Sequence, residues 1–176
     1  MPALRRAPAG PLLREERPGD LAAVAVAITA AFGRPDETKL VAGLATDGDV
    51  VASLVAEIDD IIVGHVLFSR LPIEHRLGRL AALSLAPLAV VPQHQRQGIG
   101  SALVRTGLAR CRERGEAAVV VLGEPSYYGR FGFSAEAAQR LAAPFSGSAF
   151  MALELVPGSL AIDQGRVRYP AAFGLG

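Results

Sequence analysis

The chain has 176 residues, 51% of them hydrophobic, and its 18 basic and 17 acidic side chains leave a formal net charge of +1. This length and composition suit one domain with a sizeable core. Because so small a net charge creates no field that would draw the protein to nucleic acid or to an anionic membrane, we expect its partner to be a small molecule or a peptide segment.

The N-terminal part predicts a flexible tail over residues 1–10, followed by a single domain over residues 11–176. A strand is expected over 12–16 and an apolar helix over 20–31, with Asp20 as the N-cap of the helix. The apolar run is too short to span a membrane, and acidic residues separate it from the arginine pair near the start. We therefore expect neither a membrane anchor nor a twin-arginine signal.

The rest of the chain predicts helices and strands in alternation. A second helix is expected over 35–44 and another after the loop that ends near residue 98, with Cys111 on its buried face. A lone cysteine forms no internal disulfide, and no cysteine and histidine lie at metal-ligand spacing, so a reducing, cytoplasmic setting without a metal is expected. Further strands are expected over residues 51–58, 61–70, 80–91, 117–122, 150–155 and 166–169, and a short helix is expected from Pro125.

The run 80–91 is almost entirely apolar, which is typical of a central strand buried on both faces, but Pro87 interrupts it. Proline cannot donate to a sheet ladder, so a bulge is expected at this position. The bulge leaves backbone groups of Leu88, Ala89 and Val90 free to bind something other than a neighbouring strand.

The stretch that follows this strand enters an amphipathic helix through a turn that carries Gly98 and Gly100. The first N–H groups of a helix have no intrahelical partner, and glycines let an anion approach the backbone, so the turn predicts a phosphate site. A nucleotide-hydrolysing loop would need a lysine after the last glycine, and a dinucleotide fingerprint would need a small residue at Leu103. A plain strand-to-helix turn is the remaining alternative.

The pattern Gln95-x-x-Gly98-x-Gly100 resembles the acetyl-CoA pyrophosphate loop of the GNAT N-acetyltransferase superfamily. The segment 127–133, in which a tyrosine lies four residues before a Gly-Phe pair, is similar to the second signature of that superfamily. The order and separation of the two signatures agree with the resemblance. The segments 14–20, 64–69 and 165–170 also resemble a bacterial branch of predicted, mostly uncharacterised acetyltransferases, so the resemblance covers nearly the whole chain.

The resemblance implies an α/β fold with a mixed central sheet of about six to seven strands flanked by helices, and acetyl-CoA as cosubstrate. The bulged strand then offers its backbone to the pantetheine arm, backbone N–H groups from residues 96–101 hold the pyrophosphate, and Gln95 orders the turn. The residues expected to bind the cofactor are Leu88, Ala89, Val90, Val91, Gln95, Arg96, Gln97, Gly98, Ile99, Gly100 and Ser101.

Transfer of an acetyl group to a primary amine by direct attack needs a neutral amine, a donor to the oxyanion and a proton for the departing thiolate. Tyr128, and not Tyr127, lies four residues before Gly132, so the resemblance makes Tyr128 the general acid. A phenol with a pKa of about 10 is suited to protonate a thiolate whose thiol has a pKa near 8.5. Tyr127 is expected only to pack, and a backbone N–H of Ala89 or Val90 is the expected oxyanion donor.

The general base is not evident, because the strand 80–91 carries no carboxylate where many relatives have one. The substitutes are a water chain to solvent or one of four residues, and His65 is instead expected to be structural. The first is Glu57, near the end of the first hairpin strand, and the next two are Glu74 and His75, in the loop after the second hairpin strand. The fourth is Glu124, whose alternative role is to cap the short helix.

The missing carboxylate keeps a second hypothesis open, in which the domain binds acyl-CoA as a catalytically inactive sensor or interaction module. If the protein is an enzyme, its acceptor is expected to be a small-molecule amine or an amine of a peptide or protein, contacted by residues around 20–48 and 71–80. The sequence also leaves open whether the protein forms a homodimer.

Overall fold

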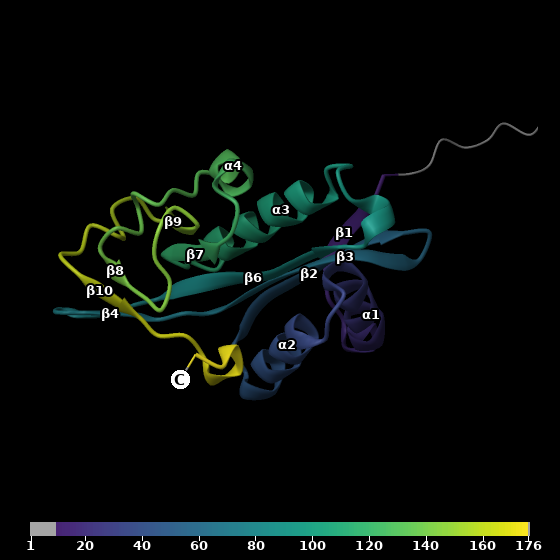
Figure 1. Cartoon of the computed structure of the whole chain (residues 1–176), viewed down its shortest axis with the longest axis horizontal. Helices are drawn as coiled ribbons and strands as arrows, with labels where there is room; N and C mark the ends of the chain where they lie inside the picture. The colour runs from purple at the N-terminus through teal and green to yellow at the C-terminus, as the bar shows by residue number, and fades with distance from the viewer. Residues whose placement is uncertain (1–9, 176) are drawn as a thin grey trace, which may run out of the picture.

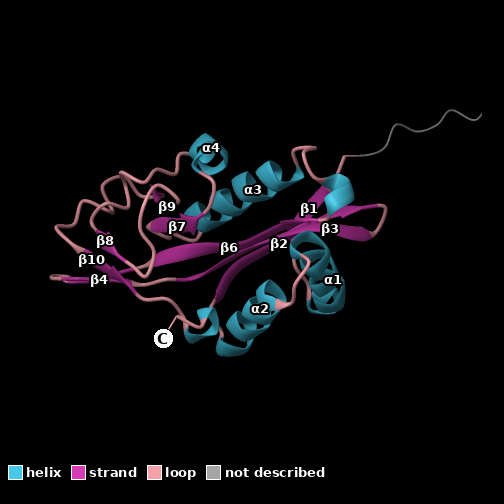
Figure 2. Ribbon diagram, in the orientation of Figure 1, coloured by secondary structure: helices cyan, strands magenta, loops and turns pink. Residues whose placement is uncertain are grey.

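A mixed six-stranded sheet separates two layers of helices in the computed structural model, which describes residues 10–175. The strand order is β1-β2-β3-β6-β7-β9, with α1 and α2 on one face and α3 and α4 on the other (Figures 1 and 2). The strands are β1 Leu12–Glu15, β2 Val50–Ile58, β3 Ile61–Arg70, β6 Ala82–Val90, β7 Ala118–Leu122 and β9 Phe150–Glu154. The helices are α1 Leu21–Phe32, α2 Asp36–Asp47, α3 Ile99–Glu113 and α4 Pro125–Tyr128.

Four short strands form a second sheet, in the order β5-β4-β10-β8, at the end of the molecule that is on the left in Figure 1. Single-turn 3-10 helices occur at η1 Pro18–Asp20, η2 Pro92–His94, η3 Gly129–Phe131 and η4 Ala171–Phe173. The strands of the second sheet are β4 Ile73–His75, β5 Gly78–Leu80, β8 Leu141–Ala142 and β10 Gly165–Val167.

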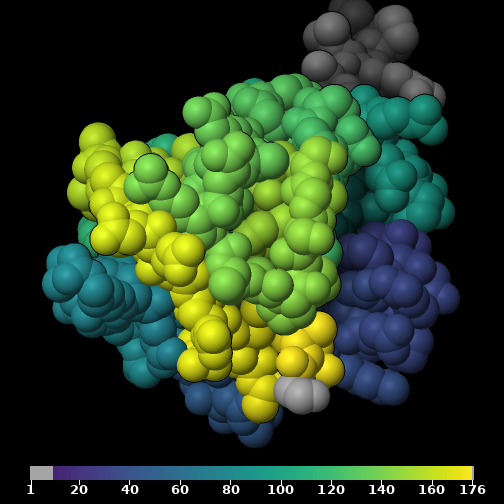
Figure 3. Space-filling view, turned by 60° about the vertical axis from the view of Figure 1, so that its left-hand side comes forward, coloured from purple at the N-terminus to yellow at the C-terminus, as the bar shows by residue number. Residues whose placement is uncertain are grey.

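The second sheet corrects two sequence expectations. The run 80–91 is not one strand, because its first residue ends β5, which pairs with β4, whereas Ala82 begins β6 in the main sheet. Glu74 and His75 do not lie in a loop, because β4 pairs antiparallel with β10, which comes some ninety residues later in the chain. The strands β4 and β5 form a hairpin. In Figure 3 the C-terminal third of the chain lies between this hairpin and the helices α1 and α2.

The beginning of the chain also differs from expectation. The predicted tail lies outside the described residues, apart from the exposed Gly10. The carboxylate of Asp20 does not cap α1: it accepts hydrogen bonds from the Arg17 backbone N–H (2.7 Å) and from the Arg14 guanidinium (2.6 Å), and so closes η1 instead. Arg14 also pairs with Glu57 at 2.6 Å, which joins β1 to β2. No helix in the range 10–175 is both long enough and apolar enough for a membrane span.

Side chains alternate across the main sheet and fill a core on each face. Along β3, Val66 and Phe68 face α3, whereas Leu67 faces α1. Cys111 is fully buried in the α3 core, as predicted, and burial raises the pKa of its thiol to about 12. The thiol therefore remains protonated and acts as a small apolar group.

Helix α3 approaches the sheet closely because residue 107 is a glycine. A Cβ at Gly107 would overlap the ring of Phe68, which is itself fully buried. The glycine therefore allows the helix to lie directly on the aromatic ring, and this contact fixes the height of α3 above β3.

We predict that Gly107→Ala destabilises the fold by about 1–3 kcal/mol, because the added methyl group must displace a buried ring or lift the helix. Urea unfolding followed by circular dichroism measures the change. Gly19→Ala is the matched control, since a Cβ there meets nothing within 4 Å. Equal stability of the two variants would show that α3 tolerates a larger separation from the sheet.

Candidate active site

The central feature of the site is a gap between β6 and β7. In the described part of the chain the two strands pair in parallel only from Ala82 to Ser84, although β6 continues to Val90. On its other edge β6 pairs with β3, and this pairing is irregular because two residues of β6, Ala86 and Pro87, face the single residue Leu67 of β3. The predicted bulge at Pro87 is therefore present, and the second half of β6 presents backbone groups along the edge that faces the gap.

The loop after β6 is folded onto the end of the strand. The Gln95 side-chain amide donates to the carbonyl oxygen of Val90 at 2.9 Å, so Gln95 orders the turn as predicted. Arg96 and Gly98 have positive φ angles of 58° and 84°, and α3 begins at Ile99 directly after them. The free N–H groups of the first turn of α3 therefore lie beside the open edge of β6.

A cavity of about 500 Å³ lies where the loop, β6 and α4 meet. Most of the predicted cofactor residues line it, together with three residues that the sequence did not assign to the cofactor. Its walls are Leu88, Val90, His94, Gln95, Arg96, Gly98, Gly100, Ser101, Tyr127 and Arg130.

The other predicted cofactor residues have their side chains elsewhere. Ala89 is buried in the core under α1, because alternation along β6 turns it away from the cavity. Ile99 is buried in the α3 core and Val91 packs against both cores. The Gln97 side chain donates to the carbonyl oxygen of Gln93 at 3.1 Å. The side chains of Ala89 and Ile99 are therefore closed to a ligand.

The two adjacent tyrosines serve different places. Tyr127 packs edge-on against Phe131, as predicted, and its hydroxyl also lies above Gly100, where a Cβ would be only 2.8 Å from the phenol oxygen. Tyr128 instead covers Gly123, the residue after β7, so closely that a Cβ there would overlap its ring. Tyr127 is thus near the loop, whereas Tyr128 is near the end of β7.

Burial dominates the chemistry of Tyr128. Desolvation, with a smaller contribution from Tyr127, raises the pKa of the Tyr128 phenol to about 12. Its ring packs edge-on against Phe133, with ring centroids 5.9 Å apart. The hydroxyl therefore keeps its proton over the whole physiological pH range.

The family follows from comparison with known proteins. Residues 13–135 match the family model described as the acetyltransferase (GNAT) domain. The chain belongs to the GNAT acetyltransferase family. It is 36% identical over 165 residues to the uncharacterized N-acetyltransferase YhbS of Escherichia coli K12, a match that covers 92% of this chain and 98% of YhbS. It is 41% identical over 107 residues to the uncharacterized N-acetyltransferase YjhQ of the same organism, but it spans only 59% of YjhQ.

Solved GNAT structures confirm the predicted fold. The structure of YhbS from Escherichia coli in complex with CoA matches with a TM-score of 0.86 at 35% identity and covers 98% of both chains. A GNAT acetyltransferase from Brucella melitensis in complex with acetyl-CoA matches with a TM-score of 0.76 at 34% identity, over 93% of this chain and 97% of that one.

The carboxylates that were considered as a general base for this GNAT protein are engaged elsewhere. Glu57 pairs with Arg14, and Glu124 caps α4 by accepting from the N–H and hydroxyl of Ser126, as its alternative role predicted. In the second sheet Glu74 pairs with Arg79 of β5 and with Arg168, the residue after β10. The hydrogen bond from Arg168 is the main cause that lowers the pKa of Glu74. None of these residues, nor His75, lines the cavity.

Glu16, Ser53 and His65 form a polar cluster under α1, of which the sequence predicted only His65. His65 is fully buried, as predicted, and its Nε2 lies 2.8 Å from the Ser53 hydroxyl and 3.3 Å from the Glu16 carboxylate. Desolvation acts to raise the pKa of Glu16, but the bonds from His65 and Ser53 outweigh it and lower the pKa. Glu16 and Ser53 also border a separate cavity of about 670 Å³ between α1 and α2, which contains no predicted cofactor residue.

Proposed function

We propose that the protein is an acetyl-CoA-dependent N-acetyltransferase that transfers the acetyl group to a primary amine by direct attack. The proposal rests chiefly on the early end of the pairing between β6 and β7, which leaves the second half of β6 with an open edge. Two features support it: α3 begins directly after the loop at the end of β6, and the protonated Tyr128 covers Gly123 just after β7. The CoA and acetyl-CoA complexes of the two similar GNAT proteins support the choice of donor.

The cofactor is proposed to bind in two parts. Its pyrophosphate lies against backbone N–H groups from Arg96 to Ser101, where the α3 dipole favours negative charge and Gly98 leaves room for close approach. Arg96 adds a positive charge to the cavity wall. The pantetheine arm then runs along the open edge of β6 and hydrogen-bonds to backbone groups between Leu88 and Val90, which places the thioester in the gap.

Acetyl transfer begins when the neutral amine attacks the thioester carbonyl. The backbone N–H of Val90 donates to the oxyanion of the tetrahedral intermediate. N–H groups alternate between the two edges of a strand, and the Val91 N–H bonds to the Val63 carbonyl oxygen of β3, so the N–H of Ala89 is turned toward β3 and that of Val90 toward the gap. As that intermediate collapses and the C–S bond breaks, Tyr128 donates to the departing sulfur. Because the pKa of Tyr128 is above the value of about 8.5 for a thiol, full proton transfer is uphill. The phenol therefore acts chiefly through a hydrogen bond that strengthens as charge develops on sulfur. The departing thiolate takes its proton from solvent water, which also receives the proton of the attacking amine.

The proton of the attacking amine is proposed to leave through water. Glu57 and Glu74 are held by arginines and Glu124 caps a helix, so these carboxylates are occupied. Water in the gap needs no dedicated side chain, and the cavity beside it is open to solvent. The acceptor then approaches from the side of the gap that is opposite the cofactor, and it is an amine of a small molecule or of a peptide or protein.

The proposed enzyme consists of residues 11–176 as one domain. The family match ends at residue 135, but β9, which follows it, completes the main sheet beside β7. The last turn, η4, packs on α2, where Ala172 lies against Gly43. The segment after residue 135 therefore belongs to the same structure.

We predict that acetyl-CoA at about 100 times its dissociation constant stabilises the protein by roughly 2.7 kcal/mol and that free thiol appears when suitable amines are supplied. Tyr128→Phe should lower kcat about 100-fold, because the hydrogen-bond donor to the departing sulfur is lost, and leave acetyl-CoA affinity unchanged. Thermal unfolding and thiol release over a panel of amines, amino acids and peptides measure these effects.

Tyr127→Phe is the matched control for that experiment, since it removes a neighbouring phenol that lies near the loop, and its kcat should stay within about threefold of wild type. Full activity of Tyr128→Phe would remove Tyr128 from its role. Stabilisation by acetyl-CoA without thiol release for any amine would favour the inactive acyl-CoA-binding module. The absence of a carboxylate from the cavity wall is the observation that supports this second candidate.

We further predict that Gly100→Ala weakens acetyl-CoA binding about tenfold, a change of about 1.4 kcal/mol. The new methyl group would fill the space between the first turn of α3 and the Tyr127 hydroxyl. Isothermal titration calorimetry measures the affinity, and the thermal midpoint without ligand should change little because the obstructing atom ends a flexible side chain. Unchanged affinity would place the pyrophosphate away from this turn.

A further inference from the structure

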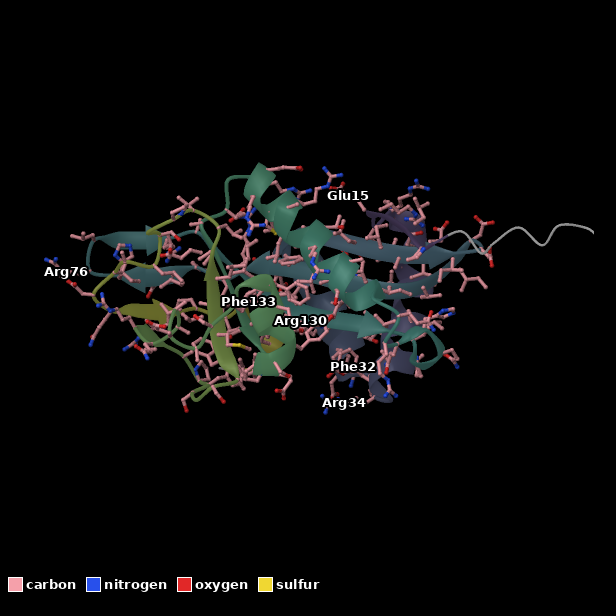
Figure 4. All side chains as sticks on the ribbon, turned by 90° about the horizontal axis from the view of Figure 1, so that it is seen from above. Glu15, Phe32, Arg34, Arg76, Arg130 and Phe133 are labelled. Atoms are coloured by element: carbon pink, nitrogen blue, oxygen red, sulfur yellow. The ribbon has the colours of Figure 1, made fainter. Side chains whose placement is uncertain are left out.

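Arg130 is the cation of the cavity that the proposed reaction does not use. It reaches the cavity from η3, and in Figure 4 it lies between α4 and α3. Its guanidinium carbon is 4.4 Å from the centre of the Tyr127 ring, and its Nε donates to the Tyr127 carbonyl oxygen at 3.1 Å. Two contacts with one residue therefore hold the guanidinium in a fixed orientation.

The terminal nitrogens of Arg130 are available to a ligand. Within residues 10–175 Arg130 forms no ion pair, and its one hydrogen bond uses Nε, so both Nη groups are unoccupied. An arginine oriented in this way presents two parallel N–H donors, the arrangement that matches a phosphate group. Two arginines that line other cavities differ: Arg140 donates through Nη1 to a carbonyl, and Arg168 pairs with Glu74.

CoA carries phosphate at two places: the pyrophosphate, and a 3′-phosphate on the ribose that follows it. On the proposed function, the start of α3 takes the pyrophosphate. The ribose is attached directly to the pyrophosphate, so its 3′-phosphate must lie in or beside the same cavity. This group carries a charge of about −1.5 to −2 at neutral pH and needs a cation.

We infer that Arg130 binds the 3′-phosphate of CoA and makes the protein select CoA over 3′-dephospho-CoA. This inference rests on the proposed function, but it adds a specificity that neither the loop nor Tyr128 supplies. Tyr127 has a supporting role, because its ring and its carbonyl oxygen together orient the guanidinium.

Calorimetric titration of the full chain with CoA and with 3′-dephospho-CoA tests the inference. Wild type should bind CoA at least tenfold more tightly than 3′-dephospho-CoA. Arg130→Gln should lose this tenfold preference by weakening CoA alone, and Arg130→Lys should keep part of it, because the charge remains but the paired donors do not. Arg105→Gln is the matched control: Arg105 also lies over an aromatic ring, that of Phe131, but it does not line the cavity, and its variant should keep both affinities.

The outcomes separate the two proposals. Equal losses for both ligands in Arg130→Gln, or no loss for either, would overturn the role of Arg130 while leaving the proposed function intact. Absence of binding of either ligand to wild type would overturn the proposed function and this inference with it. Unfolding midpoints of the ligand-free variants, expected to match wild type, show that the comparison concerns folded protein.

Discussion

The structure depends on the early end of the pairing between β6 and β7. The parallel pairing of β6 with β7 stops at Ser84, whereas β6 continues past the bulge at Pro87 to Val90. Unpaired backbone groups in the middle of a sheet are costly unless something satisfies them, so the gap is a feature that a ligand or water must complete. A pantetheine arm, with its amides and carbonyls, has the chemistry of the missing strand. The same edge then supplies the proposed oxyanion donor.

The position of α3 adds a helix N-terminus to this gap, which completes the proposed cofactor site. The contact between Gly107 and Phe68 fixes the helix close above β3, and the bond from Gln95 to the Val90 carbonyl fixes the loop to the end of β6. The first turn of α3 is thereby held next to the open edge of the strand. Tyr127 contacts Gly100 in the first turn of α3, and Tyr128 contacts Gly123 just after β7.

The parts that local sequence patterns determine were predictable. Gln95 and the glycines indicated the loop, and Pro87 indicated the bulge, because each of these residues acts through its own backbone or its near neighbours. The second sheet was not predictable, since β4 joins a strand far along the chain. The pairing of Glu16 with His65 and the place of Arg130 in the cavity wall likewise depend on contacts across the fold. No spacing in the sequence encodes such contacts.

Hydrogen–deuterium exchange with and without acetyl-CoA tests most directly whether the open edge of β6 and the start of α3 together hold the cofactor. This binding mode predicts slower exchange, on adding acetyl-CoA, for the amides of Leu88 and Val90 and of residues 96–101, and little change in the part of β6 that pairs with β7. Binding accompanied by unchanged exchange in these two segments, with protection instead around the cavity between α1 and α2, would contradict it.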